Sequence, residues 1–140
     1  METISPRLQK IKETVGTCTC LGDVGTDHAL LPAAMIQEGR CSHVIASDLR
    51  KGPLAAADKN IRRFGLEDKI ELRLGGGLTV YSPSECDAIV IAGMGGLLIA
   101  QILTDSPEIA QTAERLILQP NTCQPELRRY LLEHGYEILD

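Results

Sequence analysis

The chain has 140 residues, enough for one domain that buries about two-thirds of the surface exposed by its unfolded chain. Its apolar residues are almost all aliphatic, with one Phe, three Tyr and no Trp, which favours helices packed on a buried parallel sheet. A net charge of −5 excludes a large basic surface for nucleic acid, and because we find neither a membrane span nor a signal peptide, we expect a cytoplasmic protein without membrane contact.

A short helix is predicted first, because Ser5 followed by Pro6 is typical of a helix N-cap, and Leu8, Ile11 and Val15 form an apolar stripe. Strand-like and helix-like segments then alternate. The expected strands cover about 18–23, 43–48, 69–74, 87–92 and 115–119, the helices about 28–38, 53–64, 95–104 and 124–134, and a last strand starts at Tyr136. This alternation predicts an α/β fold with a doubly wound, mostly parallel sheet, helices on both faces and a ligand at the carboxyl ends of the strands.

The cysteines give little sign of a metal site or of disulfides. Their number is odd, no Cys-x-x-Cys pair occurs, and no His stands at ligand spacing, so we expect no metal. Cys18 and Cys20 alternate along a predicted strand and should point to one face, where a free cysteine behaves as a small apolar residue.

A carboxylate at the end of the first strand restricts the ligand. Asp23 stands between Gly22 and Gly25, where a dinucleotide site would bring pyrophosphate close to the backbone. An aspartate would repel that phosphate by about 4 kcal/mol at ~4 Å and an effective dielectric near 20, and would attract a cation equally. S-adenosylmethionine, which carries a sulfonium and an ammonium group, therefore fits this turn better than NAD.

A second carboxylate, Asp48, ends the next strand. An acidic residue one β-α-β unit after the first turn is placed to accept hydrogen bonds from both hydroxyls of a ribose. The alternative is a cap on the helix that begins near Gly52 and Pro53, but several loop residues intervene.

Two glycine clusters follow the third and fourth strands. Gly75, Gly76 and Gly77 let the backbone come close to a flat ligand such as adenine, although a plain flexible loop would have the same composition. The segment 92–96, Ala-Gly-Met-Gly-Gly, interrupts a buried apolar strand before helical periodicity resumes, which indicates a close approach of the backbone to another group. Met94 is a candidate ligand contact, although methionine more often fills a core.

Polar residues next to these strand ends have two interpretations each. Gln119 and Asn121 follow the fifth strand, in a turn or in a loop that faces a substrate. His28 either orients its neighbours at a helix start or acts in acid-base chemistry.

Six motifs together resemble the bacterial tRNA adenine-N1 methyltransferase family, which modifies an adenosine in the D-arm. They are Ser-Pro-Arg-Leu at 5–8, Asp-Val-Gly-Thr-Asp-His at 23–28, Ala-Ser-Asp at 46–48, Arg-Leu-Gly at 73–75, Ala-Gly-Met-Gly-Gly at 92–96 and Leu-Gln-Pro-Asn at 118–121. The resemblance implies a class I, Rossmann-like methyltransferase fold, S-adenosyl-L-methionine as methyl donor and tRNA as acceptor.

The resemblance also implies a set of site residues. The cofactor would contact Asp23, Gly25, Asp48, Leu49, Gly75, Gly76, Gly77, Ala92, Gly93 and Met94. Because N1 of adenine has its own lone pair, catalysis needs positioning more than deprotonation. We expect Asp27 to stabilise the positive charge that develops on the base, His28 to orient Asp27, and Asn121 or Gln119 to contact a flipped-out base.

Two departures from the family pattern stand out. Gly76 replaces a residue that is often Asp or Asn in the family, which would remove a hydrogen bond to adenine. The chain also stops at Asp140, whereas the family continues through a last strand and a coiled-coil-like helical domain. We therefore expect residues 1–140 to be one truncated catalytic domain that binds tRNA weakly and that either forms a homodimer through an exposed sheet edge or ends in a disordered tail.

Three other functions are compatible with parts of the sequence. The same cofactor motifs would serve a methyltransferase acting on another substrate, or a module that binds cofactor without catalysis. A dehydrogenase ranks last, because the turn after the first strand lacks the third glycine of Gly-x-Gly-x-x-Gly.

Overall fold

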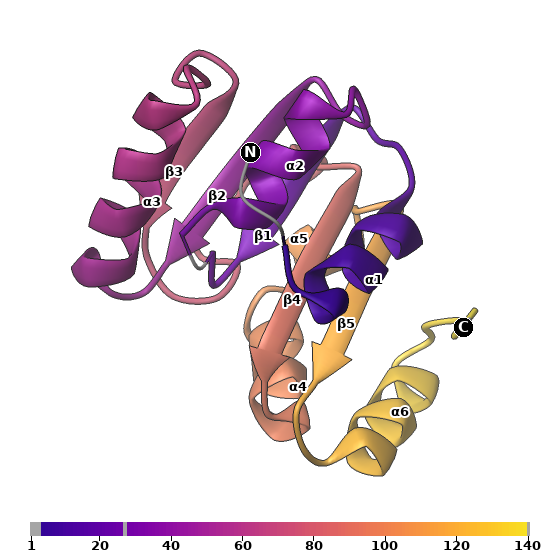
Figure 1. The fold of residues 1–140 in the computed structure, drawn as a ribbon. Coiled ribbons are helices and arrows are strands. Elements are labelled where there is room, and N and C mark those ends of the chain that lie inside the picture. Colours follow the sequence, from indigo (N-terminus) through magenta and orange to yellow (C-terminus); the bar gives the residue numbers. More distant parts are fainter. Residues whose placement is uncertain (1–3, 27, 140) are drawn as a thin grey trace.

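Five parallel strands form one sheet at the centre of the molecule, in a computed structural model that describes residues 4–26 and 28–139 (Figure 1). The strands are β1 Cys20–Val24, β2 His43–Asp48, β3 Ile70–Leu74, β4 Ala88–Met94 and β5 Arg115–Pro120. Their order is β3-β2-β1-β4-β5, and all four neighbouring pairs are parallel. The predicted doubly wound, Rossmann-like sheet is confirmed.

In the described part of the chain, six helices cover the sheet. They are α1 Pro6–Val15, α2 Leu30–Gln37, α3 Lys51–Arg63, α4 Gly96–Asp105, α5 Pro107–Ala110 and α6 Gln124–Glu133. One apolar cluster joins α1, α2 and α3 to the sheet through residues such as Leu21 and Val44, and a second joins α4, α5 and α6 to the opposite face through Val24 and Ile45. Successive strand residues therefore supply the two cores alternately, as the pleat of a strand requires.

Local signals place the first helix where the sequence predicts it. The Ser5 hydroxyl accepts a hydrogen bond from the Leu8 backbone N–H at 3.2 Å, Pro6 occupies the first helical position, and Gly16 follows the helix with a φ of +69°. The cap satisfies one of the N–H groups that a helix start leaves without a partner.

The strand order reverses between β1 and β4, and doubly wound sheets form their ligand crevice at such a reversal, outside the carboxyl ends of the strands. Asp23 pairs with Val90 across this junction, and Asp48 ends β2 on the other side of β1. Ligands of doubly wound sheets bind at such a reversal, so the fold places both carboxylates at the expected ligand edge.

The predicted strand from Tyr136 is wrong, because residues 136–139 lie in no strand. Gly135, with a φ of +83°, follows α6, and the Tyr136 N–H donates to the carbonyl of Leu131 at 2.9 Å. Tyr136 and Ile138 pack against the second core cluster instead of pairing with β5. Within the described residues β5 forms the edge of the sheet, and a homodimer through such an edge stays a prediction.

The prediction that Cys18 and Cys20 share one face is also wrong. The strand starts only at Cys20, so the alternation of a strand does not extend back to Cys18. Cys18 packs with the cluster beneath α1 to α3, whereas Cys20 packs with the cluster beneath α4 to α6. The short helix α5 has no counterpart among the predicted elements.

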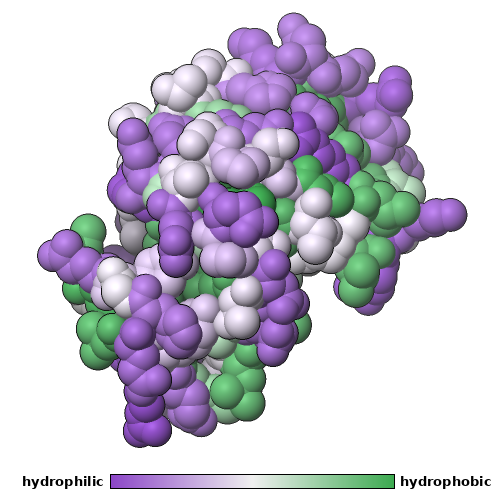
Figure 2. Space-filling model, turned by 180° about the vertical axis from the view of Figure 1, so that it is seen from behind, coloured by the Kyte–Doolittle hydropathy of each residue, from purple (hydrophilic) through white to green (hydrophobic). Residues whose placement is uncertain are grey.

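Most side chains on the face seen from behind are hydrophilic, and the hydrophobic ones gather in a few small patches (Figure 2). Exposed large apolar side chains include Leu49 after β2 and Leu97 and Leu98 at the start of α4. No helix among the described residues is long and apolar enough to cross a bilayer.

Candidate functional site

Asp23 is a buried carboxylate at the end of the central strand. Its side chain faces the layer of α1 and α2, and the residue is only 7% exposed. The pKa of Asp23 is raised to about 6, because burial, helped by the charge of Asp48, outweighs the lowering effects of the Thr26 hydroxyl and the Arg7 guanidinium. At neutral pH the site therefore contains a poorly solvated anion, which a cationic ligand would stabilise.

A small cavity of about 60 Å³ lies beside this carboxylate. It is lined by Asp23 and Gly25 from the first strand and its turn, by Ala92 from β4, and by Arg7 from α1. The cavity thus has an anion and a cation in its wall. A much larger hollow of about 1070 Å³ runs along β5 between α6 and residues 134–139, and none of the predicted site residues lines it.

Arg7 and Gln119 form a hydrogen-bonded pair next to the site, which the sequence did not reveal. The Gln119 side-chain oxygen accepts hydrogen bonds from Arg7 Nη1 at 3.3 Å and from the Gly93 backbone N–H at 3.2 Å. The two hydrogen bonds join α1 to the glycine turn at the end of β4. Gln119 therefore positions protein groups, and the sequence signal was only its place in the Leu-Gln-Pro-Asn motif.

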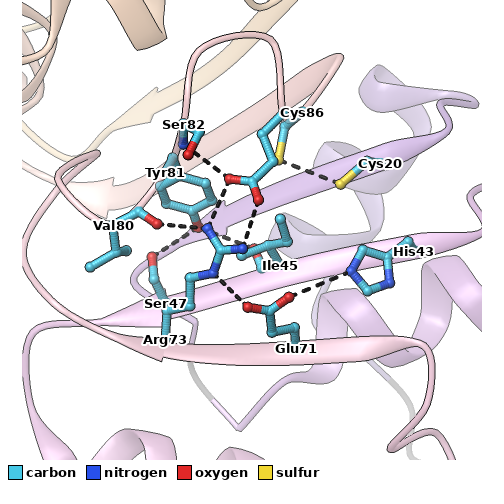
Figure 3. Close-up of polar contacts among 11 residues, drawn as sticks. Cys20, His43, Ile45, Ser47, Glu71, Arg73, Val80, Tyr81, Ser82 and Cys86 are labelled. Carbon is cyan, nitrogen blue, oxygen red and sulfur yellow. Dashed lines mark hydrogen bonds and ion pairs between the residues drawn. The ribbon is translucent and has the colours of Figure 1, made fainter.

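The turn after β1 is attached to the end of β2. The backbone N–H groups of Gly25 and Thr26 both donate to the Ser47 carbonyl at 2.9 Å. The Ser47 hydroxyl is fully buried and lies 2.9 Å from the Tyr81 hydroxyl, which also donates to the Ile45 carbonyl at 3.1 Å (Figure 3). These bonds hold Asp23 and Asp48 at a constant separation.

Asp48 is brought together with the glycine loop after β3, as predicted. Its Oδ1 accepts from the Arg50 backbone N–H at 2.9 Å, and its Oδ2 accepts no hydrogen bond from the described residues. The Gly75 N–H donates to the Asp48 carbonyl at 2.9 Å, and a Cβ on Gly76 would lie 3.3 Å from Leu49. One carboxylate oxygen of Asp48 thus stabilises the loop that follows β2.

The other glycines are explained by protein contacts. A Cβ on Gly75 would overlap Val80, and a Cβ on Gly77 would lie 3.2 Å from Ile102. A Cβ on Gly96 would lie 2.5 Å from the Cys123 carbonyl, so the group that the backbone approaches there is the loop after β5. Met94 packs over Gly25, where a Cβ would lie 2.8 Å from its methyl carbon.

Of the three predicted catalytic residues, the structure describes His28 and Asn121. Asp27 lies outside the described residues. His28 is exposed with a φ of +57°, and its carbonyl accepts a hydrogen bond from the Asn60 side chain at 2.8 Å. Asn121 is exposed, and its backbone N–H donates to the Met94 carbonyl at 2.8 Å, which places it beside the glycine turn of β4.

An arginine-centred network supports the loop between β3 and β4 (Figure 3). Arg73 donates to both oxygens of Glu85 at 2.8 and 2.7 Å, to Glu71 at 2.7 Å and to the Val80 carbonyl at 2.6 Å. The Arg73 guanidinium lowers the pKa of Glu85 and lies 6.0 Å from the centre of the Tyr81 ring. Arg73 of β3 therefore holds the loop that carries the glycine cluster through hydrogen bonds to Val80 and Glu85.

Comparison with known proteins gives one family and several close relatives. The family model described as a methyltransferase domain matches residues 4–140. The tRNA (adenine(22)-N(1))-methyltransferase of Bacillus subtilis is 39% identical over 137 residues, which cover 98% of this chain and 58% of that protein.

Solved structures agree with this match. Streptococcus pneumoniae Sp1610, described as a candidate tRNA (m1A22) methyltransferase and solved with S-adenosyl-L-methionine, is 40% identical with a TM-score of 0.94. TrmK of M. capricolum, solved with S-adenosyl-homocysteine, is 30% identical with a TM-score of 0.86. They cover 99% and 98% of this chain, which spans 65% and 61% of their own lengths.

The raised pKa of Asp23 makes a testable contribution to stability. Because the folded protein binds this proton more tightly than the unfolded chain, the contribution is present below pH 4 and is lost as the pH rises to about 6. Relative to Asp23→Asn, the parent should lose up to about 3 kcal/mol of unfolding free energy between pH 4 and 6 and no more above it. Urea denaturation at each pH measures the difference.

The exposed Asp68 supplies the control, since Asp68→Asn should follow the parent at every pH. Parallel curves for Asp23→Asn and the parent would show that the carboxylate is not perturbed.

Proposed function

The chain belongs to the methyltransferase-domain family, and we propose that it transfers a methyl group from S-adenosylmethionine to N1 of an adenosine in the D-arm of tRNA. The observation that carries the proposal is the pair of carboxylates, Asp23 and Asp48, at the reversal of the strand order. The pair suits a ligand with a cation at one end and a ribose at the other. The tRNA acceptor follows from the activity named for the Bacillus relative.

The charges around the small cavity fit the amino-acid end of the cofactor. An α-ammonium group would approach Asp23, and an α-carboxylate would approach Arg7, which lines the same cavity. Gly25 and Ala92 leave room between these charges, and Gly93 and Met94 bound the same end. A zwitterion matches this wall, whereas a pyrophosphate would meet the Asp23 anion.

The nucleoside end of the cofactor would occupy the other half of the crevice. Asp48 Oδ2 would accept hydrogen bonds from the ribose hydroxyls. The adenine would lie between Leu49, which is 71% exposed, and the loop of Gly75, Gly76 and Gly77. Without a side chain at Gly76, apolar contact and backbone groups would recognise the ring.

The methyl transfer itself requires alignment. The N1 lone pair of adenine would form a bond to the methyl carbon as the carbon–sulfur bond breaks, giving a cationic base and the neutral thioether. Asp27 would stabilise the positive base, His28 would orient Asp27, and Asn121 would contact a base flipped out of its stack.

The partner and domain assignments extend the same proposal. Residues 1–140 would form one catalytic domain, and with a net charge of −5 it would attract the phosphates of tRNA only weakly. A tRNA substrate places the protein in the cytoplasm.

Replacement of Asp48 tests the ribose contact. Asp48→Ala should weaken S-adenosylmethionine binding by about 1.5–3 kcal/mol, since a charged hydrogen-bond acceptor is lost. Asp48→Asn keeps an oxygen for the Arg50 N–H and should lose less, and Asp68→Ala should lose nothing. Isothermal titration calorimetry measures all four proteins. Equal affinities for the parent and Asp48→Ala would refute the ribose contact.

Replacement of Asp27 tests the chemical role. Asp27→Asn should keep cofactor affinity within a few-fold but lower methyl transfer, because the amide preserves the shape and removes the charge. The measurement is transfer of a radiolabelled methyl group to unmodified tRNA, with position 22 analysed. Undiminished turnover by the variant would assign the catalytic role to another residue.

A parent that binds the cofactor but methylates only a small molecule or a protein would refute the tRNA substrate, and one that transfers nothing would indicate a binding module.

A further inference from the structure

The thiols of Cys20 and Cys86, which the proposed function does not use, are in contact at the amino ends of β1 and β4. Cys20 is the first residue of β1, and Cys86 stands two residues before β4. Their sulfur atoms are 3.6 Å apart, and Figure 3 shows the two side chains pointing toward each other. The two cysteines are 66 positions apart in the sequence, which gave no sign of this contact.

The backbone holds the two thiols together. Asp87, next to Cys86, accepts hydrogen bonds on its carboxylate from the N–H groups of Thr19 and Cys20 at 2.9 and 2.8 Å. The Asp87 N–H donates in turn to the Cys20 carbonyl at 3.2 Å. A disulfide needs a sulfur separation of ~2.05 Å, so its formation requires only a short movement of two side chains on a braced backbone.

The two sulfurs differ in reactivity. Cys20 is half-buried, and its hydrogen bond with the Cys86 thiol lowers its pKa, against burial and the charges of Asp87 and Glu85. Cys86 is 3% exposed, and its hydrogen bond with Cys20 together with burial raises its pKa. The more exposed and more acidic thiol is the one that an oxidant meets first.

We propose that Cys20 and Cys86 form a redox modification site that a hydroperoxide converts to a reversible disulfide. The Cys20 thiolate attacks the O–O bond of hydrogen peroxide, which forms a sulfenic acid and releases hydroxide. The Cys86 sulfur then attacks the Cys20 sulfur, and the S–O bond breaks as the S–S bond forms. The two thiol protons leave in two water molecules, so the sulfurs lose two electrons and the peroxide gains them.

The bond would form at the end of the sheet opposite the two site carboxylates. Cys20 starts the strand that Asp23 and Val24 end, and Cys86 precedes the start of β4. The disulfide would therefore join the amino ends of two neighbouring strands and leave the carboxyl-end crevice open. The inference does not depend on the proposed function.

Peptide mapping tests the proposal on the intact protein. The folded chain is treated with hydrogen peroxide, alkylated in denaturant and digested with trypsin. Cleavage after Lys12, Arg40, Arg73 and Arg115 places Cys86 alone in peptide 74–115 and Cys20 with Cys18 in peptide 13–40. We expect these two peptides to be linked, with a mass about 2 Da below their sum, and to separate on reduction with dithiothreitol.

Two variants and one control make the assignment specific. In Cys18→Ser the link should persist, which identifies Cys20 as the partner. In Cys86→Ser the sulfenic acid on Cys20 has no thiol to react with, so trapping by dimedone should increase several-fold over the parent. Cys123→Ser, which changes a thiol outside the pair, should behave as the parent.

Three results would overturn the proposal. The first is an unlinked pair after peroxide treatment, with both cysteines still alkylated. The second is a link that disappears in Cys18→Ser. The third is dimedone trapping on Cys20 that is equal in the parent and Cys86→Ser.

Discussion

The buried carboxylate of Asp23 is the group around which this end of the molecule is organised. A carboxylate with 7% exposure loses most of its hydration, and its pKa of about 6 reflects that loss. The protein compensates only in part, with the Thr26 hydroxyl and the charge of Arg7. A bound cation would offset the remaining desolvation cost of the Asp23 carboxylate. The burial of Asp23 therefore favours binding of a cationic ligand.

The rest of the structure keeps that carboxylate in register with a second one. Ser47 receives the N–H groups of the turn after β1 and is itself held by Tyr81. Tyr81 belongs to the loop that Arg73 ties to β3 through Glu85 and Val80. The polar contacts of Figure 3 thus connect β2 and β3 to the loop between β3 and β4.

The sequence predicted the parts of this arrangement that depend on local patterns. The cap at Ser5, the alternation of strands and helices and the two strand-end carboxylates all follow from short-range rules. Contacts between distant residues were not predictable in this way, as with Arg73 and Glu85 or Arg7 and Gln119, because single residues of each type occur throughout the chain. The glycines at 95 and 96 were recognised as a close approach, but only the fold shows that the approaching group is the loop after β5. Tyr136 does not begin a strand, because its side chain packs against the core next to α6.

The dependence of S-adenosylmethionine affinity on pH tests the role of the Asp23 charge most directly. Calorimetric titration of the parent between pH 5 and 7 stays below the pKa of an α-amino group, about 7.7–8.0, so the cofactor keeps its ammonium charge throughout. If only the ionised carboxylate binds, a pKa of about 6 makes the dissociation constant about tenfold smaller at pH 7 than at pH 5. We expect that tightening in the parent and its absence in Asp23→Asn. Affinity that is unchanged or weaker at pH 7 would contradict selection of the cofactor by this buried anion.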